Sequence, residues 1–372
     1  MNSDYNQLFE PLQFPNGGTI ENRIVMAPMT TNSSFENGMV TTDELNYYGR
    51  RAKGLGAVIT ACAQVMEDGR FPGSFSVASD NRIESLSKVA QVIQEQGSKA
   101  ILQIFHVGRM GTRRTLKAEQ PVAPSEVPAM RVDAEVPRAL TGEEVTEMVD
   151  AFGEATRRAI QAGFDGVELH GANTYLIQQF FSPHSNRRMD EWGGTLEKRM
   201  QFPLAVVDAA KKAIEKYADK PFILGYRISP EEIEEPGISL EDTLHLLSHL
   251  KEKGLDYIHI SLGDYKQTSI RNKEEDTPIL EVILEAVGED VPVIGVGNVK
   301  TPDEAVELRN MRIPIVAIGR QLIVEPDWVS KVQKNEENEI RTVIKKVDRN
   351  DLQIPDEMWE NLQKRTGWVP FE

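Results

Sequence analysis

The segment that decides the fold spans residues 164–183 and reads FDGVELHGANTYLIQQFFSP. Its first six residues, FDGVEL, form a short apolar run that predicts a buried strand. His170, Asn173 and Tyr175 come at the C-terminal end of this strand and in the loop that follows it. In a (β/α) barrel the catalytic side chains lie at this end of the strands, so the segment predicts both an architecture and a site within it.

These three side chains suit chemistry at a carbonyl group. His170 and Asn173 can each donate a hydrogen bond to one carbonyl oxygen and so stabilise the negative charge that develops there. The phenol of Tyr175 can deliver a proton to carbon. A histidine after a strand can equally be a structural residue whose hydrogen bonds are satisfied within the fold, so the segment alone leaves both roles open.

Short apolar runs alternate with amphipathic segments from one end of the chain to the other. Helical patterns such as those of residues 143–161 and 201–216 separate the runs, which favours parallel strands joined by crossover helices. We predict strands at residues 24–27, 57–62, 100–105, 166–169, 222–226, 257–260, 293–295 and 315–318. Eight strands in this order predict an α/β fold, the closed (β/α)₈ TIM barrel.

A doubly wound open sheet is the alternative architecture. Such a sheet usually has a glycine-rich dinucleotide-binding turn after its first strand. Here the first strand runs instead into Ala27, Pro28, Met29 and Thr30. The late sequence GVG at residues 295–297 lacks the third glycine and is a weak signal of a dinucleotide site.

Several features lie outside the regular alternation. Residues 1–22 are expected to form a hairpin that caps the bottom of the barrel, because Asn16-Gly17 between apolar residues is a strong hairpin signal. Long loops are expected after the third and fourth strands, at residues 106–140 and 171–199, on the active-site side of the barrel. Residues 330–372 are interpreted as a C-terminal helical tail. No linker or composition shift divides the chain, so we expect one domain over residues 1–372.

Composition narrows the range of functions. Forty-two basic against 58 acidic residues give a net charge of −16, which disfavours binding to nucleic acid or to anionic membrane surfaces. No basic or apolar leader begins the chain and no run approaches the roughly 20 apolar residues of a membrane helix, so we expect a cytoplasmic protein.

Cysteine and histidine usage argues against metal centres. Cys62 is the only cysteine, which excludes an intrachain disulfide and an iron–sulfur cluster held by about four thiolates of one chain. His245 and His249 have the i,i+4 spacing of zinc ligands, but no glutamate of the metalloprotease pattern lies between them. We therefore expect no metal site and interpret these histidines as a solvated helix face.

Five ordered motifs carry a family resemblance. The segment HGANTYLIQQFFSP, with Asn186, Arg187, Asp190 and Trp192-Gly193-Gly194 after it, resembles the signature of the old yellow enzyme family of FMN-dependent ene reductases. The same family pattern recurs as NRIVMAPMT at residues 22–30, LQIFHVGR at 102–109, GYRIS at 225–229 and, as one two-part motif, VGN at 296–298 with IGR at 318–320. The matches cover nearly the whole chain, and the single cysteine indicates the form of the family without an iron–sulfur cluster.

The resemblance implies bound FMN and assigns residues to it. Arg227 would hold the N1/O2 edge of the flavin, where charge accumulates on reduction, and Gln103 would bond its pyrimidine edge. Thr30 would lie near flavin O4, with Ala27, Pro28, Met29 and the backbone of Cys62 completing that side. An ordinary salt bridge at the barrel rim is the alternative for Arg227, and packing is the expected role of the Cys62 thiol.

A phosphate site can be argued without the family. Gly297, Asn298, Gly319 and Arg320 follow the seventh and eighth strands, where barrels of this class often bind phosphate. Glycines let backbone N–H groups approach the anion, and arginine offers a bidentate fork. Other phosphate-bearing ligands would fit these residues equally well.

The function that the resemblance implies is reduction of α,β-unsaturated carbonyl compounds, with NADH or NADPH as the reductant. His170 and Asn173 would hold the substrate carbonyl, Tyr175 would protonate carbon, and Phe105 would shape the pocket or pack in the barrel wall. The alternatives are a flavin oxidoreductase with a quinone, nitro compound or dioxygen as acceptor, and a barrel that binds a phosphorylated ligand without catalysis.

Three departures from the family pattern put the shape of the substrate in doubt. Asn32 and Ser33 stand where one branch of the family has an aromatic residue, and Thr174 replaces a frequent glycine. Near the end of the chain, RTGW at residues 365–368 resembles a tail that in some members enters a neighbouring subunit, which predicts a homo-oligomer.

Overall fold

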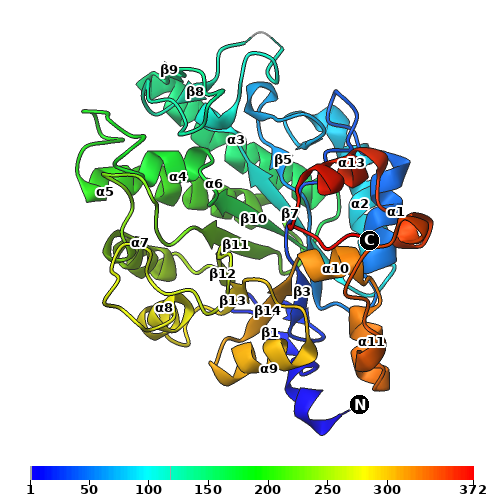
Figure 1. The fold of residues 1–372 in the computed structure, drawn as a ribbon. Coiled ribbons are helices and arrows are strands. Elements are labelled where there is room, and N and C mark those ends of the chain that lie inside the picture. Colours follow the sequence, from blue (N-terminus) through cyan, green and yellow to red (C-terminus); the bar gives the residue numbers. More distant parts are fainter. Residues whose placement is uncertain (1, 118) are drawn as a thin grey trace.

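Eight parallel strands close into a barrel in the computed structural model, which describes residues 2–117 and 119–372 (Figure 1). Met1, and Ala118 within the predicted loop 106–140, lie outside the described residues. The ring closes because β7 pairs with both β4 and β10. In ring order the strands are β3 (Ile24–Met26), β4 (Ala57–Ile59), β7 (Lys99–Phe105), β10 (Gly166–Gly171), β11 (Ile223–Ile228), β12 (Tyr257–Ile260), β13 (Val293–Val296) and β14 (Ile315–Ile318). The predicted (β/α)₈ barrel is confirmed.

Helices join the strands and surround the barrel (Figure 1). They are α1 (Thr42–Arg51), α2 (Ile83–Gln94), α3 (Gly142–Gln161), α6 (Gln201–Tyr217), α7 (Leu240–Glu252), α8 (Ile279–Val287), α9 (Pro302–Asn310), α10 (Arg320–Val324) and α11 (Trp328–Lys334). Four of them begin with a capping box, in which a Thr or Ser side chain and an acidic side chain three residues later satisfy each other's backbone N–H. These local signals fix where each crossover helix starts.

Strand ends differ from the prediction by one to three residues at the places that matter for a site. β4 ends at Ile59, so Cys62 lies in the following loop and not in the strand. β10 and β11 run further than predicted, to Gly171 and Ile228, so both His170 and Arg227 lie within strands. Pairing with neighbouring strands extends β10 and β11 beyond their apolar runs, because a backbone ladder does not require apolar side chains.

The barrel interior has a polar half and an apolar half. Inward positions on β7, β10, β11 and β12 carry Gln103, Glu168, His170, Arg227 and His259, all of them buried. Inward positions on β13, β14, β3 and β4 belong instead to an apolar cluster that includes Ile294, Ile315, Val25 and Ile59. The cluster continues below the polar side chains through Ile101, Ile223 and Tyr257. Burying polar side chains costs free energy unless they find partners, so the polar half is the part of the barrel that needs a further explanation.

The N-terminal hairpin plugs the barrel bottom, as predicted. Strands β1 (Leu12–Gln13) and β2 (Thr19–Ile20) pair antiparallel, and Phe14 joins them in the apolar cluster of the lower interior. Asn16 donates two hydrogen bonds of 3.0 Å to the carboxylate of Asp256, just before β12. Gly17 has a φ of +87°, which the turn requires and glycine adopts without strain.

The insertions contain more structure than the sequence predicted. The long segment after β4, with β5 (Ala63–Gln64), η2 (Glu67–Gly69), β6 (Phe75–Ser76) and η3 (Asp80–Arg82), was not predicted as an insertion. Residues 106–140 hold η4 (Gly108–Met110), β8 (Val122–Ala123) and β9 (Arg138–Ala139). Residues 171–199 form the long insertion predicted after the fourth strand, and it contains the unpredicted helices α4 (Leu176–Phe181) and α5 (Leu196–Arg199). The apolar residues of α4 are buried, and their packing stabilises the helix. The segment is too short for a helical periodicity to be recognised in its sequence.

The C-terminal tail is only partly helical. Short helices η5 (Glu337–Glu339), η6 (Lys346–Asp348), α12 (Arg349–Leu352) and α13 (Asp356–Lys364) alternate with extended chain, and Ile344 forms a bridge to Phe371. The N-terminus begins with η1 (Ser3–Leu8). Residues of the tail such as Trp359 and Val369 share one buried cluster with the barrel helices. The single-domain division of the chain stays an interpretation.

Among the described helices, none is both long enough and apolar enough to cross a membrane.

Candidate active site

A cavity of about 740 Å³ opens at the C-terminal ends of the strands. Its walls come from the ends of β3, β11, β13 and β14 and from the last residues of the chain. Eight of the predicted site residues line it, namely Ala27, Pro28, Met29, Asn173, Arg227, Asn298, Gly319 and Arg320. The barrel therefore brings together residues that lie almost 300 positions apart in the sequence, where barrels of this fold place their chemistry.

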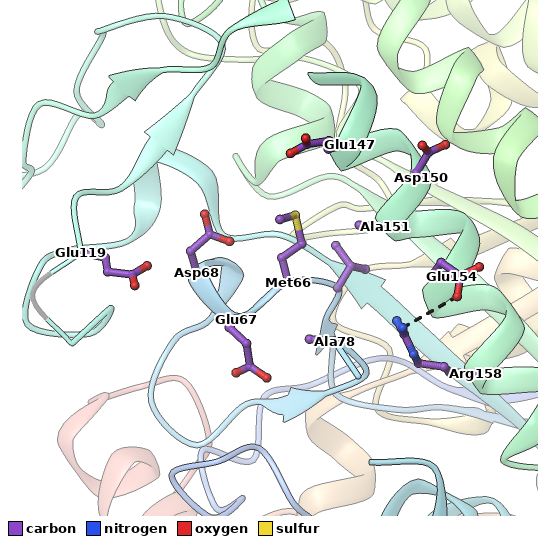
Figure 2. A pocket seen from close by; sticks show the side chains of 11 residues that line it. Met66, Glu67, Asp68, Ala78, Glu119, Glu147, Asp150, Ala151, Glu154 and Arg158 are labelled. Atoms are coloured by element: carbon purple, nitrogen blue, oxygen red, sulfur yellow. Dashed lines mark ion pairs between the residues drawn. The ribbon is translucent and has the colours of Figure 1, made fainter. Parts of the chain in front are cut away.

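Charge distinguishes this cavity from a second one. The described lining of the first includes Arg227, Lys300 and Arg320 and no carboxylate. The second, of about 570 Å³, lies between α3 and the segment after β5, and Figure 2 shows the acidic side chains around it. Its described lining holds six carboxylates and one arginine, which pairs with Glu154. An anionic ligand would be attracted by the first cavity and repelled by the second.

Arg227 is the buried cation of the first cavity. It is 7% exposed, and its Nε has no hydrogen-bond partner among the described residues. Burial lowers the pKa of Arg227 from its ordinary value, while the nearby Glu168 acts in the opposite direction. No carboxylate lies within ion-pair distance in the described part of the chain, so the predicted alternative of an ordinary rim salt bridge is not what the structure shows. A buried guanidinium with an unused N–H fits an anionic or strongly accepting ligand edge.

The turns after β13 and β14, which contain Gly297 and Gly319, form one end of the cavity region. Gly297 has a φ of +155°, and a Cβ there would lie 2.2 Å from the backbone nitrogen of Tyr265, so only glycine fits. Asn298 is left-handed, with a φ of +58°, and its Oδ1 accepts a 2.8 Å hydrogen bond from Arg320. Arg320 is the first residue of α10. This arrangement leaves guanidinium and backbone N–H donors beside Lys300, as a phosphate would require.

The C-terminal segment covers one side of the same cavity. Gly367 and Trp368 belong to its lining, and Arg320 donates a 3.4 Å hydrogen bond to the carbonyl of Trp368. The Arg365 guanidinium lies 5.7 Å from the centre of the Trp368 ring. The sequence predicted that RTGW enters a neighbouring subunit. In this structure the motif lies against its own barrel, and the homo-oligomer stays a prediction.

Below the rim, Glu168 of β10 forms hydrogen bonds to side chains of two other strands, β7 and β12. One carboxylate oxygen accepts a 2.7 Å hydrogen bond from Gln103 Nε2, and the other lies 2.9 Å from His259 Nδ1. All three side chains are buried. Neither Glu168 nor His259 was predicted as a site residue, although a charged residue and an imidazole at inward positions of apolar strands are a usable signal.

His170 is the second-to-last residue of β10, beside Arg227 of β11, and is 3% exposed. It lies outside the described lining of the large cavity. Burial and the nearby positive charge of Arg227 lower the pKa of His170 to about 3. Its Nδ1 accepts a hydrogen bond of 3.4 Å from the backbone N–H of Ala172. A neutral imidazole whose Nδ1 accepts must carry its proton on Nε2, which is therefore the free donor.

Asn173 and Tyr175 follow on the loop. Asn173 is left-handed, with a φ of +56°, and its backbone N–H donates to Ser229 Oγ at 2.9 Å. Its Oδ1 accepts from Ser261 Oγ at 2.9 Å, so the amide N–H₂ is the part that remains available. Burial raises the pKa of Tyr175 well above its ordinary value, with Cys62 adding to the effect, and the phenol stays protonated.

An aromatic wall lies beside Tyr175. The ring of Phe105 is 5.1 Å from Tyr175 and 5.1 Å from Phe71, while Phe71 stacks on Tyr175 at 6.3 Å. Phe105 was predicted to shape a pocket or pack in the wall, and its ring contacts are compatible with both. Phe71 was missed, because a residue in an irregular loop 34 positions before Phe105 gives no local sign that it will meet the site.

Thr30 and Cys62 are not part of the described lining of the large cavity. Thr30 is half-buried and lines a cavity of about 180 Å³ with Met29, Arg365 and Trp368. Cys62 is buried beside Phe105 in an apolar cluster, and burial raises the pKa of its thiol to about 12. A thiol in this state is protonated and poorly nucleophilic, which agrees with the packing role expected for it.

The two helix histidines face each other without a metal-site geometry. Their ring centroids are 5.0 Å apart, and His249 Nδ1 lies 3.0 Å from the His245 carbonyl. Across the described residues, no group of three or more His, Cys, Asp or Glu side chains is arranged to hold a metal ion.

Comparison with known proteins resolves the family. Residues 7–339 match the model of the NADH:flavin oxidoreductase / NADH oxidase family. The chain belongs to this family. It is 46% identical to the probable NADH-dependent flavin oxidoreductase YqiG of Bacillus subtilis (strain 168) over 373 aligned positions, which cover all of both chains. It is 45% identical to NADH:fumarate oxidoreductase of Klebsiella pneumoniae (strain 342) over 95% of its own length, but it spans only 38% of that longer protein.

The barrel of an old yellow enzyme homologue from Zymomonas mobilis superimposes on this one with a TM-score of 0.76 and 26% identity, covering 88% of this chain and 93% of the other. The resemblance to the old yellow enzyme family is thus confirmed. This family member is an NADH- or NADPH-dependent oxidoreductase whose cofactor is FMN. The unused Arg227 N–H, the Gly297 turn and the cationic lining of the large cavity all fit a flavin mononucleotide.

Proposed function

We propose that the protein reduces the activated C=C bond of α,β-unsaturated carbonyl compounds with electrons from NADH or NADPH. Bound FMN, once reduced, supplies the hydride for the β-carbon of the substrate. The observation that carries the proposal is a pair of available donors at the end of β10. His170 Nδ1 accepts from Ala172, which places the imidazole proton on Nε2, and Asn173, three residues later in the cavity lining, has its amide N–H₂ unoccupied.

These two donors would hold the carbonyl oxygen of the substrate. Hydride addition at the β-carbon moves negative charge onto that oxygen, so donors placed there stabilise the transition state more than the ground state. His170 is suited to the task because it stays neutral: an imidazole with a pKa of about 3 donates without titrating near neutral pH. The contacts with Ser261 and Ala172 occupy the acceptor atoms of Asn173 and His170, which leaves the amide N–H₂ and the imidazole Nε2–H as donors.

Tyr175 would protonate the α-carbon. Its ring is held edge to face against His170 and Phe105, and its raised pKa keeps the proton on oxygen until the reaction draws it away. Arg227 and Gln103 would hold the flavin edge, Ala27, Pro28, Met29, Thr30 and the Cys62 backbone would contact the ring, and Gly297, Asn298, Gly319 and Arg320 would bind its phosphate.

A second candidate keeps the flavin and changes the acceptor. The chain matches 38% of NADH:fumarate oxidoreductase, so a barrel of this kind can form one part of a longer protein. As the NADH-oxidising part, it would pass electrons to another acceptor group, for example a quinone, and not directly to an enone. An open cavity beside the flavin edge would admit either an enone or a quinone.

The visible spectrum of the purified protein separates the two candidates. We expect flavin absorption that bleaches on anaerobic addition of NADH or NADPH and recovers on addition of cyclohexenone. Recovery with a quinone but not with cyclohexenone would replace the enone with the second candidate. Recovery with neither would overturn both proposals while leaving the family assignment intact.

A further inference from the structure

Glu168 occupies the centre of the polar half of the barrel, directly below the cavity. It is 0% exposed, and its two carboxylate oxygens are used separately, one by Gln103 on β7 and one by His259 on β12. The ring of Tyr257 covers this layer, since a Cβ on Gly225 would lie 2.1 Å from it. His259 Nε2 and the Tyr257 hydroxyl are buried without hydrogen-bond partners among the described residues. Glu168 is not needed to close the barrel, and an apolar residue would cost less to bury.

Its charge acts on the same groups that face the flavin. Backbone register places Arg227 of β11 beside His170 of β10 on one side and His259 of β12 on the other, one layer above Glu168. Glu168 is the strongest carboxylate influence on Arg227. Burial would raise the pKa of Glu168, but the hydrogen bonds from His259 and Gln103 and the positive charge of Arg227 act against burial, and that pKa lies below its ordinary value. Burial and Arg227 lower the pKa of His259, so at neutral pH the carboxylate is charged and the imidazole is neutral.

We propose that Glu168 is a positioning residue that sets the reduction potential of the bound flavin, by fixing the amide of Gln103 and by supplying the counter-charge of Arg227. Because Gln103 gives an N–H to Glu168, its amide orientation is fixed and its carbonyl oxygen Oε1 is left to accept, as it would from flavin N3–H. The inference rests on the FMN site proposed above and is independent of the enone as acceptor.

The charge balance gives the direction of the effect. With Glu168 ionised, His259 neutral and Arg227 protonated, these three buried side chains together carry no net charge. A neutral oxidised flavin would leave that balance unchanged. Reduction adds negative charge at the N1/O2 edge. The carboxylate opposes that charge and holds the potential down, so that the reduced flavin remains a strong hydride donor.

The test is Glu168→Gln, which keeps the shape of the side chain and removes its charge. We expect the equilibrium between oxidised and reduced FMN to shift toward the reduced form by roughly ten- to a hundred-fold, the range for one unit charge at an effective dielectric near 20. The potential is measured by reductive titration of the holoenzyme against a reference dye, with no enone present. In stopped flow, flavin reduction by NADH should become faster or stay equal while reoxidation becomes slower.

Two control variants separate charge from structural damage. Glu232→Gln neutralises another buried carboxylate, which accepts from Gln178 and Ser182 outside the polar half of the barrel interior, and the flavin potential should not change. Tyr257→Phe removes a hydroxyl from the layer of Glu168 without changing its charge, and the potential should again stay near that of the wild type. A merely structural lesion at Glu168 would slow both half-reactions and leave the potential unshifted.

An unshifted or lowered potential in Glu168→Gln would overturn the proposal. If Glu168→Gln does not fold, Glu168→Asp provides the second test, since it retains the charge and withdraws the oxygen from Gln103. FMN affinity should fall about ten-fold, the value of one hydrogen bond to a charged group, with the potential near that of the wild type. An unchanged FMN affinity in Glu168→Asp would overturn the positioning role. Failure of cyclohexenone to reoxidise the wild type would affect only the proposed function, because neither readout uses it.

Discussion

The imidazole of His170 and the phenol of Tyr175 meet edge to face, with ring centroids 4.9 Å apart and an angle of 77° between their planes. One ring lies on the last residues of β10 and the other at the start of α4, five residues later. Between them, Asn173 and Thr174 both adopt left-handed backbone, with φ of +56° and +66°. This turn brings His170 and Tyr175, the proposed carbonyl-binding donor and the proposed proton donor, into ring contact. It includes Thr174, at a position where the family often has a glycine.

Tyr175→Phe is expected to separate the two half-reactions. Reoxidation by cyclohexenone should slow by roughly 10²- to 10⁴-fold, the usual contribution of a positioned general acid, because the phenol proton is lost. Flavin reduction by NADH should stay nearly unchanged, since it needs no proton from Tyr175. Stopped-flow absorbance at the flavin band measures both rates, and an equal loss in the two half-reactions would contradict the assignment of Tyr175 as proton donor.

His170→Ala combined with Asn173→Ala is expected to weaken binding of a saturated ketone such as cyclohexanone, which cannot be reduced by this route. Losing two hydrogen bonds to one oxygen should cost roughly ten- to a hundred-fold in affinity. Flavin perturbation spectra report the binding. Unchanged affinity would remove the two residues from the carbonyl site. The control is Ser248→Ala on α7, a hydroxyl outside the cavity that bonds only its own helix and His249.

The pH dependence of the same binding provides a separate test. The folded pKa of His170 is about 3, below its ordinary value, so its imidazole is already neutral at every pH above that and gains no charge until the solution becomes strongly acidic. Ketone affinity should therefore show no titration of His170 between about pH 5 and 8, although an exposed histidine would titrate there. A midpoint between these limits that disappears in His170→Gln would show that His170 titrates in the folded enzyme, contrary to this expectation.

Gly297→Ala is expected to weaken FMN binding by at least about ten-fold through backbone strain of a few kcal/mol, because the new Cβ would overlap the backbone at Tyr265 and the φ of +155° disfavours any L side chain. Gly263→Ala is the matched control. It lines the same cavity, but a Cβ there finds its nearest neighbour 4.0 Å away. Fluorescence titration of the apoprotein with FMN gives both dissociation constants, and equal effects of the two substitutions would argue against a tight phosphate turn at Gly297.

Phe71→Ala is expected to change substrate preference. Removing the ring that packs on Phe105 and Tyr175 opens space beside the proton donor, so enones with bulky substituents should gain relative to cyclohexenone in kcat/KM, by about ten-fold for a pocket change worth 1–3 kcal/mol. Phe35→Ala removes a ring that is 59% exposed on a neighbouring loop and should leave the ratio unchanged. The ratio of kcat/KM values for two enones decides the matter; an unaltered ratio in Phe71→Ala would place its ring outside the substrate pocket.

The sequence by itself determined the barrel, its strand order and eight of the residues that line the large cavity. Apolar runs, capping residues and the Asn16-Gly17 turn are local signals, and parallel strands joined by helices bring their C-terminal ends to one face whatever the details. His170, Asn173, Arg227 and the glycines of the last two strands could be predicted for that reason.

Only the tertiary structure decided which side chains meet across the barrel. Glu168 bonds to residues 65 positions before it and 91 positions after it, and Phe71 reaches Tyr175 from an insertion that had not been predicted. The covering of the cavity by Trp368, and the helical state of residues 176–181, also depend on packing against distant elements. Such contacts follow from ring closure, strand register and side-chain packing, which couple positions far apart in the chain and leave no periodic pattern around any one of them.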